Sequence, residues 1–184
     1  MTRLAGLNPE DMNAAQRAVY DEIVTGPRGG VHGPIAQLLH CPELCNHVQR
    51  IGTFLRFKGQ LSPMHRELAM SIVGRHYSSQ YVWVAHVRHA RTAKLPEDVI
   101  QALIARRRPD FHGDADLECI YDVTEALLKG GALEQGLYDR ALKRFCKEGV
   151  IELVAIAGQF SLLSMVSNLF DIEPRHSDTA KLPD

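Results

Sequence analysis

The sequence predicts an all-α protein, a compact bundle of about eight helices. Three observations support this prediction. Apolar residues recur at spacings of three and four along most of the 184 residues, as they do on the buried face of a helix. Most of the segments between loops begin with residues that cap helices, and several end at glycine. No stretch shows the sustained apolar–polar alternation that is typical of a strand, and no repeat of fixed period is visible.

The first half of the chain contains four expected helices with recognisable start and stop signals. Asn8 followed by proline and two acids opens the first helix, and Gly26 ends it. Pro42 begins the second, Gly59 ends it, and Ser62 with the following proline caps the third. The four helices are expected at about residues 9–25, 42–58, 63–77 and 79–93. The glycine-rich loop between the first two lacks the lysine of a phosphate-binding loop, so we expect a connector.

The second half contains four more expected helices. Leu95-Pro96-Glu97-Asp98 opens the fifth, and three arginines end it, as suits the negative end of a helix dipole. Asp114 opens the sixth, and Gly130-Gly131 ends it. These helices are expected at about residues 96–108, 114–129, 133–146 and 150–170. We expect a single domain over residues 1–174 and a loose tail over 175–184.

Composition excludes several classes of function. The apolar fraction of 45% is ordinary for a globular domain, and a formal net charge of −1 gives no broad field to attract nucleic acid. None of the four cysteines forms a C-x-x-C pair, and the first residues contain no apolar signal core. We therefore expect reduced thiols and a cytoplasmic protein that does not bind nucleic acid.

The run from Val150 to Phe170 is long enough to span a bilayer. It contains Glu152, Gln159 and Asn168, each of which would be costly in lipid. A helix that is apolar nearly all round is typical of a bundle centre or a subunit interface. We therefore expect no membrane contact and a homo-oligomer.

The expected fourth helix contains a candidate site. Ser79, Val82, His86 and His89 follow one another at spacings of three, four and three, which places them on one stripe. Glu67 lies in the preceding helix, and a helical hairpin can bring its carboxylate to an imidazole. Such a pair can hold one proton and pass it on. Histidines on apolar helix stripes also occur as structural residues in cores and interfaces. The spacing alone therefore does not distinguish a catalytic role from a structural one.

These residues resemble the carboxymuconolactone decarboxylase family, within the alkylhydroperoxidase D-like superfamily. In its peroxidase members, a glutamate precedes a C-x-x-C-x-x-x-H motif by twelve residues. Glu67 precedes Ser79 by twelve, and residues 79–86 have the length and terminal histidine of the motif. Residues 42–68, 90–103 and 149–170 also resemble longer members, so the similarity covers most of 36–170. It implies an alkylhydroperoxidase D-like fold and an assembly of trimers or hexamers.

The sequence departs from the family at both motif cysteines, which are Ser79 and Val82 here. Serine cannot form a disulfide, so we do not expect thiol peroxidase activity. The family's lactone decarboxylases carry a glutamate four residues before the histidine, and that position is also Val82. The catalytic candidates that remain are His86, Glu67 and Ser79. Candidate substrate-binding residues are Tyr81, Trp83, Arg56, Arg75 and His32.

The surviving groups suit proton transfer rather than covalent attack. We therefore expect cofactor-free decarboxylation or isomerisation of a small carboxylated lactone or ring acid, with an arginine holding the carboxylate. Two alternatives stay open. The chain could be a binding or scaffold protein that kept the fold and lost the activity, or a metal enzyme that uses Glu67, His86 and His89. The favoured hypothesis, proton transfer without a cofactor, needs no metal.

Overall fold

The computed structural model describes residues 2–175 and 181–183. Within these residues it contains eight α-helices and no strand, which confirms the predicted all-α class. The helices are α1 (Ala14–Thr25), α2 (Pro34–Leu38), α3 (Pro42–Phe57), α4 (Pro63–His76), α5 (Gln80–Thr92), α6 (Glu97–Ile104), α7 (Ala115–Lys129) and α8 (Gln135–Leu169).

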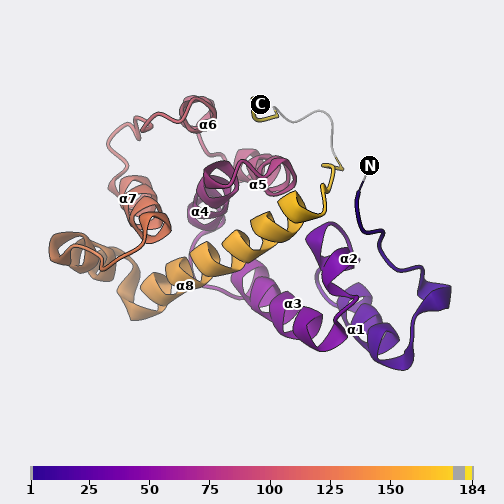
Figure 1. Ribbon diagram of the computed structural model, residues 1–184. Coiled ribbons are helices and arrows are strands. Elements are labelled where there is room, and N and C mark those ends of the chain that lie inside the picture. The colour runs from indigo at the N-terminus through magenta and orange to yellow at the C-terminus, as the bar shows by residue number, and fades with distance from the viewer. Residues whose placement is uncertain (1, 176–180, 184) are drawn as a thin grey trace.

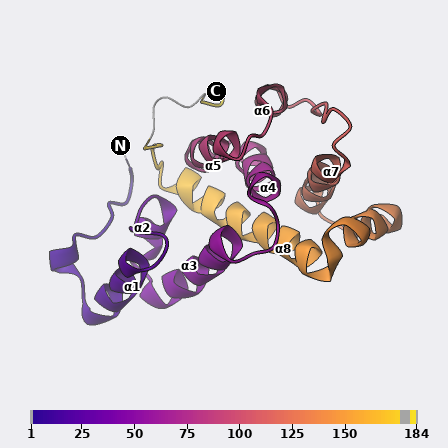
Figure 2. The same cartoon turned by 180° about the vertical axis from the view of Figure 1, so that it is seen from behind.

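The long helix α8 organises the molecule. It runs across the whole structure, with α1 to α3 on one side and α4 to α7 on the other (Figure 1). The view from behind shows the same division (Figure 2). Helix α4 packs against α5, α7 and α8, and α3 packs against α1 and α8. The core therefore lies along α8 and around α4.

Most helix starts follow the predicted caps. Proline occupies the first turn of α3 and α4, and the Ser62 side chain accepts a hydrogen bond from the His65 amide at the start of α4. The first helix differs from the prediction. Pro9–Asp11 form a 3₁₀ turn, and α1 begins after Asn13, whose side chain forms a capping box with Gln16.

One helix is added to those predicted, and one predicted helix end is confirmed. The glycine-rich connector contains the short helix α2, which Pro34 begins after Gly33 turns the chain at a φ of 56°. The expected seventh and eighth helices follow one another as the two parts of α8. The backbone leaves helical geometry between them at Cys146, where φ is 51° and ψ −175°, and this is the residue at which the sequence predicts the seventh helix to end.

Helices α4 and α5 form the predicted hairpin. Nine of the fourteen residues of α4 are buried, so this helix is enclosed on nearly every side. Ser78, with a φ of 48°, turns the chain between the two helices. A Cβ at Gly74 would lie 2.9 Å from the Trp83 amide nitrogen. The close approach of the two backbones therefore requires glycine at this position.

The polar residues of the apolar run bind neighbouring segments. Glu152 accepts hydrogen bonds from the amides of Gln60 and Leu61 at 2.9 and 3.1 Å. The side-chain amides of Gln159 and Asn168 donate to the carbonyls of Val48 and Tyr77, each at 2.8 Å. By length and composition α8 could cross a membrane, with a hydropathy of 1.8, but half of its most apolar window is buried inside the protein. Core helices meet the same criterion.

Residues 181–183 differ from the loose tail that the sequence predicts. Leu182 is 3% exposed, and its amide and carbonyl both bond to the side chain of Gln80, at 3.0 and 2.7 Å. A buried leucine whose backbone groups are both satisfied is an ordered contact. The rest of the predicted tail, apart from Arg175, lies outside the described residues.

Candidate functional site

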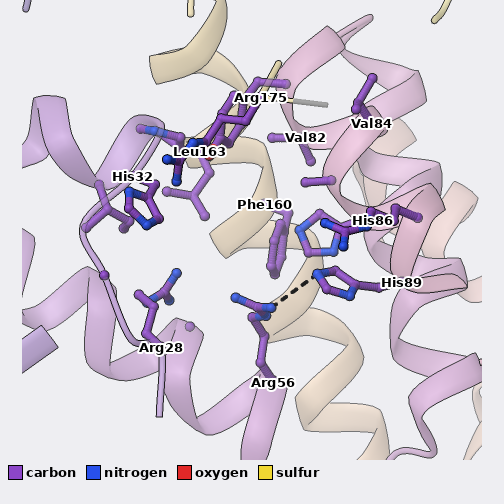
Figure 3. Close-up of a pocket in the computed structure, with 17 residues that line it drawn as sticks. Arg28, His32, Arg56, Val82, Val84, His86, His89, Phe160, Leu163 and Arg175 are labelled. Atoms are coloured by element: carbon purple, nitrogen blue, oxygen red, sulfur yellow. Dashed lines mark hydrogen bonds between the residues drawn. The ribbon is translucent and has the colours of Figure 1, made fainter. Parts of the chain in front are cut away.

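A pocket of about 380 Å³ lies where the 28–35 connector, α3, α5 and α8 meet. Arg28 and His32 lie on one side of it, His86 and His89 lie on the other, and Phe160 of α8 lies between them (Figure 3). Val82, Val84, Ala85 and Leu163 supply apolar lining. A pocket with apolar walls and a few convergent polar groups is typical of a small-molecule site.

His86 and Glu67 form the buried pair that the sequence predicts. His86 Nδ1 lies 2.7 Å from Glu67 Oε2, and both side chains are 8% exposed. His86 lines the pocket, whereas Glu67 lies behind it. The ring of Phe160 meets the imidazole edge-on, with centroids 4.7 Å apart. The ring orientation is therefore fixed, and Nε2 is the nitrogen left for a ligand.

The charge on Glu67 is maintained despite burial. Burial alone would raise its pKa, but the field and hydrogen bond of His86, with smaller contributions from His89 and Arg56, hold the pKa below the ordinary value. A Glu67 carboxylate accepts the Nδ1 proton of His86. That bond selects the tautomer whose Nε2 carries a lone pair.

His89 lies one helical turn after His86 and meets an arginine. Arg56 Nη2 is 3.5 Å from His89 Nε2 (Figure 3). Burial lowers the pKa of His89, and the nearby Glu67 opposes this effect. Within the described residues, no three His, Cys, Asp or Glu side chains are arranged to hold a metal. The geometry therefore gives no support to a metal bound by Glu67, His86 and His89.

Four arginines line the pocket: Arg88 lies on α5, and the other three come from segments far apart in the sequence. Arg28 comes from the connector, Arg56 from α3, and Arg175 from the chain after α8. Gly52 makes room for one of them, because a Cβ there would lie 2.8 Å from Arg28 Nη2. Burial and the Arg56 charge lower the pKa of Arg28, but a guanidinium stays protonated in proteins. The cluster suits an anionic ligand.

Tyr81 and His32 also line the pocket, as the sequence predicts. The Tyr81 ring packs onto the connector so closely that a Cβ at Gly33 would lie 2.0 Å from it. Burial raises the pKa of Tyr81, with the neighbouring arginines acting in the opposite direction. Burial and the Arg175 charge lower the pKa of His32. Four predicted residues thus meet in the pocket, namely His86, Tyr81, Arg56 and His32.

Three other predicted residues lie outside the pocket lining. Ser79 is fully buried at the N-cap of α5, and its hydroxyl has no hydrogen-bond partner among the described residues. Trp83 is fully buried where α5 crosses α4. The Arg75 guanidinium donates to the carbonyls of Leu103 and Ile104 at the end of α6, where it satisfies exposed backbone acceptors. None of these three side chains is therefore placed to contact a ligand bound in the pocket.

Sequence reasoning missed Arg28, Arg175 and Phe160. Arg28 follows a proline in the glycine-rich connector, and Arg175 lies in the segment predicted to be loose, so no helical spacing marked either residue. Phe160 belongs to an apolar run in which the sequence pattern predicts that every large side chain is part of the core. The one candidate that the sequence predicts in the same connector is His32.

The cysteines lie apart from this site. All four are free thiols, and none lines the pocket. Burial raises the pKa of Cys45 to about 11 and also raises that of Cys119, so both stay protonated and poorly reactive.

No protein-family model matches this sequence, and a search of curated proteins found no match.

Proposed function

We propose that the pocket binds a small carboxylated lactone or ring acid and moves a proton on it without a cofactor, by decarboxylation or isomerisation. The observation that carries this proposal is the 2.7 Å contact between His86 and Glu67 at the wall of an arginine-lined pocket. The resemblance to carboxymuconolactone decarboxylases points to the same class of reaction.

His86 is the proposed acid and base. In an isomerisation, its Nε2 lone pair takes a proton from the carbon beside a carbonyl and returns it to another carbon of the same conjugated system. In a decarboxylation, the bond to the carboxylate breaks, carbon dioxide leaves, and the bonding electrons remain as an enolate that a protonated His86 quenches. Glu67 stabilises the imidazolium in both cases.

The rest of the pocket favours a negatively charged intermediate. Arg28 and Arg56 supply fixed positive charge for a carboxylate or an enolate oxygen. Phe160, Leu163 and Val84 line the pocket with apolar surface, which lowers the local dielectric constant and strengthens each charge interaction. Tyr81 and His32 supply further polar contacts at the wall formed by the connector.

Val82 favours a second candidate function. It lines the pocket at the position where lactone decarboxylases of the family carry a glutamate. An apolar residue there removes one of the acids used for that reaction. The alternative is therefore a protein of the same fold that binds an organic acid without converting it.

A substrate screen in deuterium oxide tests both candidates. The protein is incubated with carboxylated lactones and unsaturated ring acids, and NMR detects deuterium at carbon while a trap collects carbon dioxide. We expect at least one compound to exchange or decarboxylate, and the His86→Ala protein to lose that activity. Binding without exchange or carbon dioxide release across the panel would support the second candidate instead.

A further inference from the structure

Arg175 reaches the pocket from the chain that follows α8. It follows the end of α8, where the amide of Ile172 bonds to the Ser167 carbonyl at 2.9 Å. The amide of Arg3 also bonds to the Phe170 carbonyl at 2.8 Å. The chain is therefore fixed just before it reaches the pocket.

A second attachment holds the chain beyond Arg175. Both backbone groups of Leu182 bond to the side chain of Gln80, and the leucine side chain is buried. Gln80 is the first residue of α5 and directly precedes Tyr81, which lines the pocket. We call this contact between Gln80 and Leu182 the clasp.

The charges around Arg175 indicate what it could bind. Arg28, Arg56 and Arg88 also line the pocket, and the described lining residues include no carboxylate. Guanidinium groups that line one pocket, with no carboxylate among its described lining residues, favour an anion placed between them. The Arg175 charge acts on both His32 and Tyr81, which places it on the connector side of the pocket.

We propose that Arg175 is an anion-binding residue of the pocket and that the clasp between Gln80 and Leu182 holds it in position. Part of the specificity for acids would then reside in the chain after α8. Leu182 acts as a positioning residue, because it touches α5 and does not line the pocket. This inference rests on the proposed function only in taking the ligand to be an organic acid.

Calorimetric titration at equilibrium tests the role of Arg175. The probes are phthalate, benzoate and glutarate, with the neutral diamide of phthalate as a matched control. Charge-assisted hydrogen bonds are the stronger kind, so Arg175→Gln should weaken phthalate binding by about 10-fold and leave the diamide unchanged. Arg107→Gln, an exposed arginine outside the pocket lining, removes the same net charge and should have little effect.

A double-mutant cycle tests the clasp. Leu182→Ser and Gln80→Leu should each weaken phthalate binding in the wild-type protein, but should cause no further loss in the Arg175→Gln protein. Circular dichroism of each variant confirms that it is folded. If Leu182→Ser and Gln80→Leu weakened phthalate binding equally in the wild-type and Arg175→Gln proteins, the positioning role of the clasp would be refuted.

The proposal fails if Arg175→Gln binds phthalate as tightly as the wild type, or if the wild type binds none of the three acids. Because no turnover is needed, the result is separate from the proposed function. A protein that binds phthalate through Arg175 but transfers no proton would refute that function and support this inference.

Discussion

At the residue scale, the two ring nitrogens of His86 have different roles. Nδ1 bonds to Glu67, so only Nε2 can serve a ligand. His86→Ala should therefore lower the proton-transfer rate by about 10²- to 10⁴-fold, the usual worth of a positioned acid or base. Glu67→Gln should also be damaging, because an amide keeps the shape but cannot stabilise the imidazolium. Deuterium exchange on a confirmed substrate measures both rates.

Ser79→Ala is the matched control for that pair. The Ser79 hydroxyl is buried outside the pocket lining, so its removal should leave the rate nearly unchanged. A folded His86→Ala protein with the wild-type rate would show that the pair is structural.

His89 separates the proton-transfer mechanism from a metal mechanism. It contacts Arg56 and does not touch the Glu67–His86 bond directly, so His89→Ala should change the rate little under the proposed mechanism. A metal bound by all three residues would instead require His89. Rates measured with and without added Zn²⁺ or Mn²⁺ distinguish the two, and metal-dependent activity lost in His89→Ala would contradict our assignment.

Buried histidines predict how stability depends on pH. Burial holds the pKa values of His65 and His89 below the ordinary 6.5, so the unfolded chain binds protons first as the pH falls. Their contribution to the free energy of unfolding is complete above about pH 6.5 and is lost on acidification through the folded-state pKa values. Glu67, whose pKa lies below 4.5 in the folded state, adds a second loss at lower pH.

Urea denaturation at several pH values from about 7.5 to 4 measures this effect. The midpoint should fall steadily on acidification, and His89→Gln should reduce the fall between pH 7 and 5. A midpoint that rises as the pH is lowered would contradict the buried neutral state of these imidazoles.

At the scale of helices, the sequence predicted the features that depend on local signals, such as where helices begin. Proline and serine caps placed α3 and α4, and the twelve-residue spacing from Glu67 to Ser79 anticipated the α4–α5 hairpin. The sequence could not predict the packing between helices. Trp83 and Ser79 sit on α5 beside pocket residues, but the close crossing at Gly74 turns them towards the core.

The connector and the chain after α8 show the same limit. Arg28 and Arg175 reach the pocket only because α8 brings distant segments together, and neither lies in a periodic helix. The break in α8 at Cys146, by contrast, lies where the sequence predicts a helix end, and the positive φ of that residue marks it.

Gly52 gives a prediction about how α3 shapes the pocket. Alanine favours helix over glycine, so Gly52→Ala should fold normally, but its Cβ would push against Arg28 Nη2 at 2.8 Å. The guanidinium is at the free end of a flexible side chain and should move away. We expect weaker phthalate binding in calorimetry with unchanged or higher thermal stability.

Gly136→Ala is the control, because its Cβ would meet only the Glu134 side chain near the start of α8. Unchanged phthalate affinity in Gly52→Ala would show that Arg28 does not need this space to bind an anion.

At the scale of the whole molecule, an apolar face of α8 is left exposed. Ile151, Val154, Met165 and Leu169 recur at helical spacing and are 52–67% exposed. Helix α3, which packs against α8, also exposes Leu44, Ile51, Phe54 and Phe57. Exposed apolar side chains that gather on one surface mark interaction sites in soluble proteins. We propose that copies of the chain cover it, in the trimer or hexamer that the family resemblance implies.

The assembly prediction concerns the molecular mass in solution. Light scattering at micromolar concentration should give a trimer or hexamer of the 20.5 kDa chain. Val154→Asp places a charge in the exposed face of α8, where burial without a partner is costly, so it should shift the mass towards the monomer. Lys143→Asp, at an exposed position on the same helix outside that face, should leave the assembly intact. A wild-type protein of 20.5 kDa would refute the oligomer, and the exposed face would then need another partner.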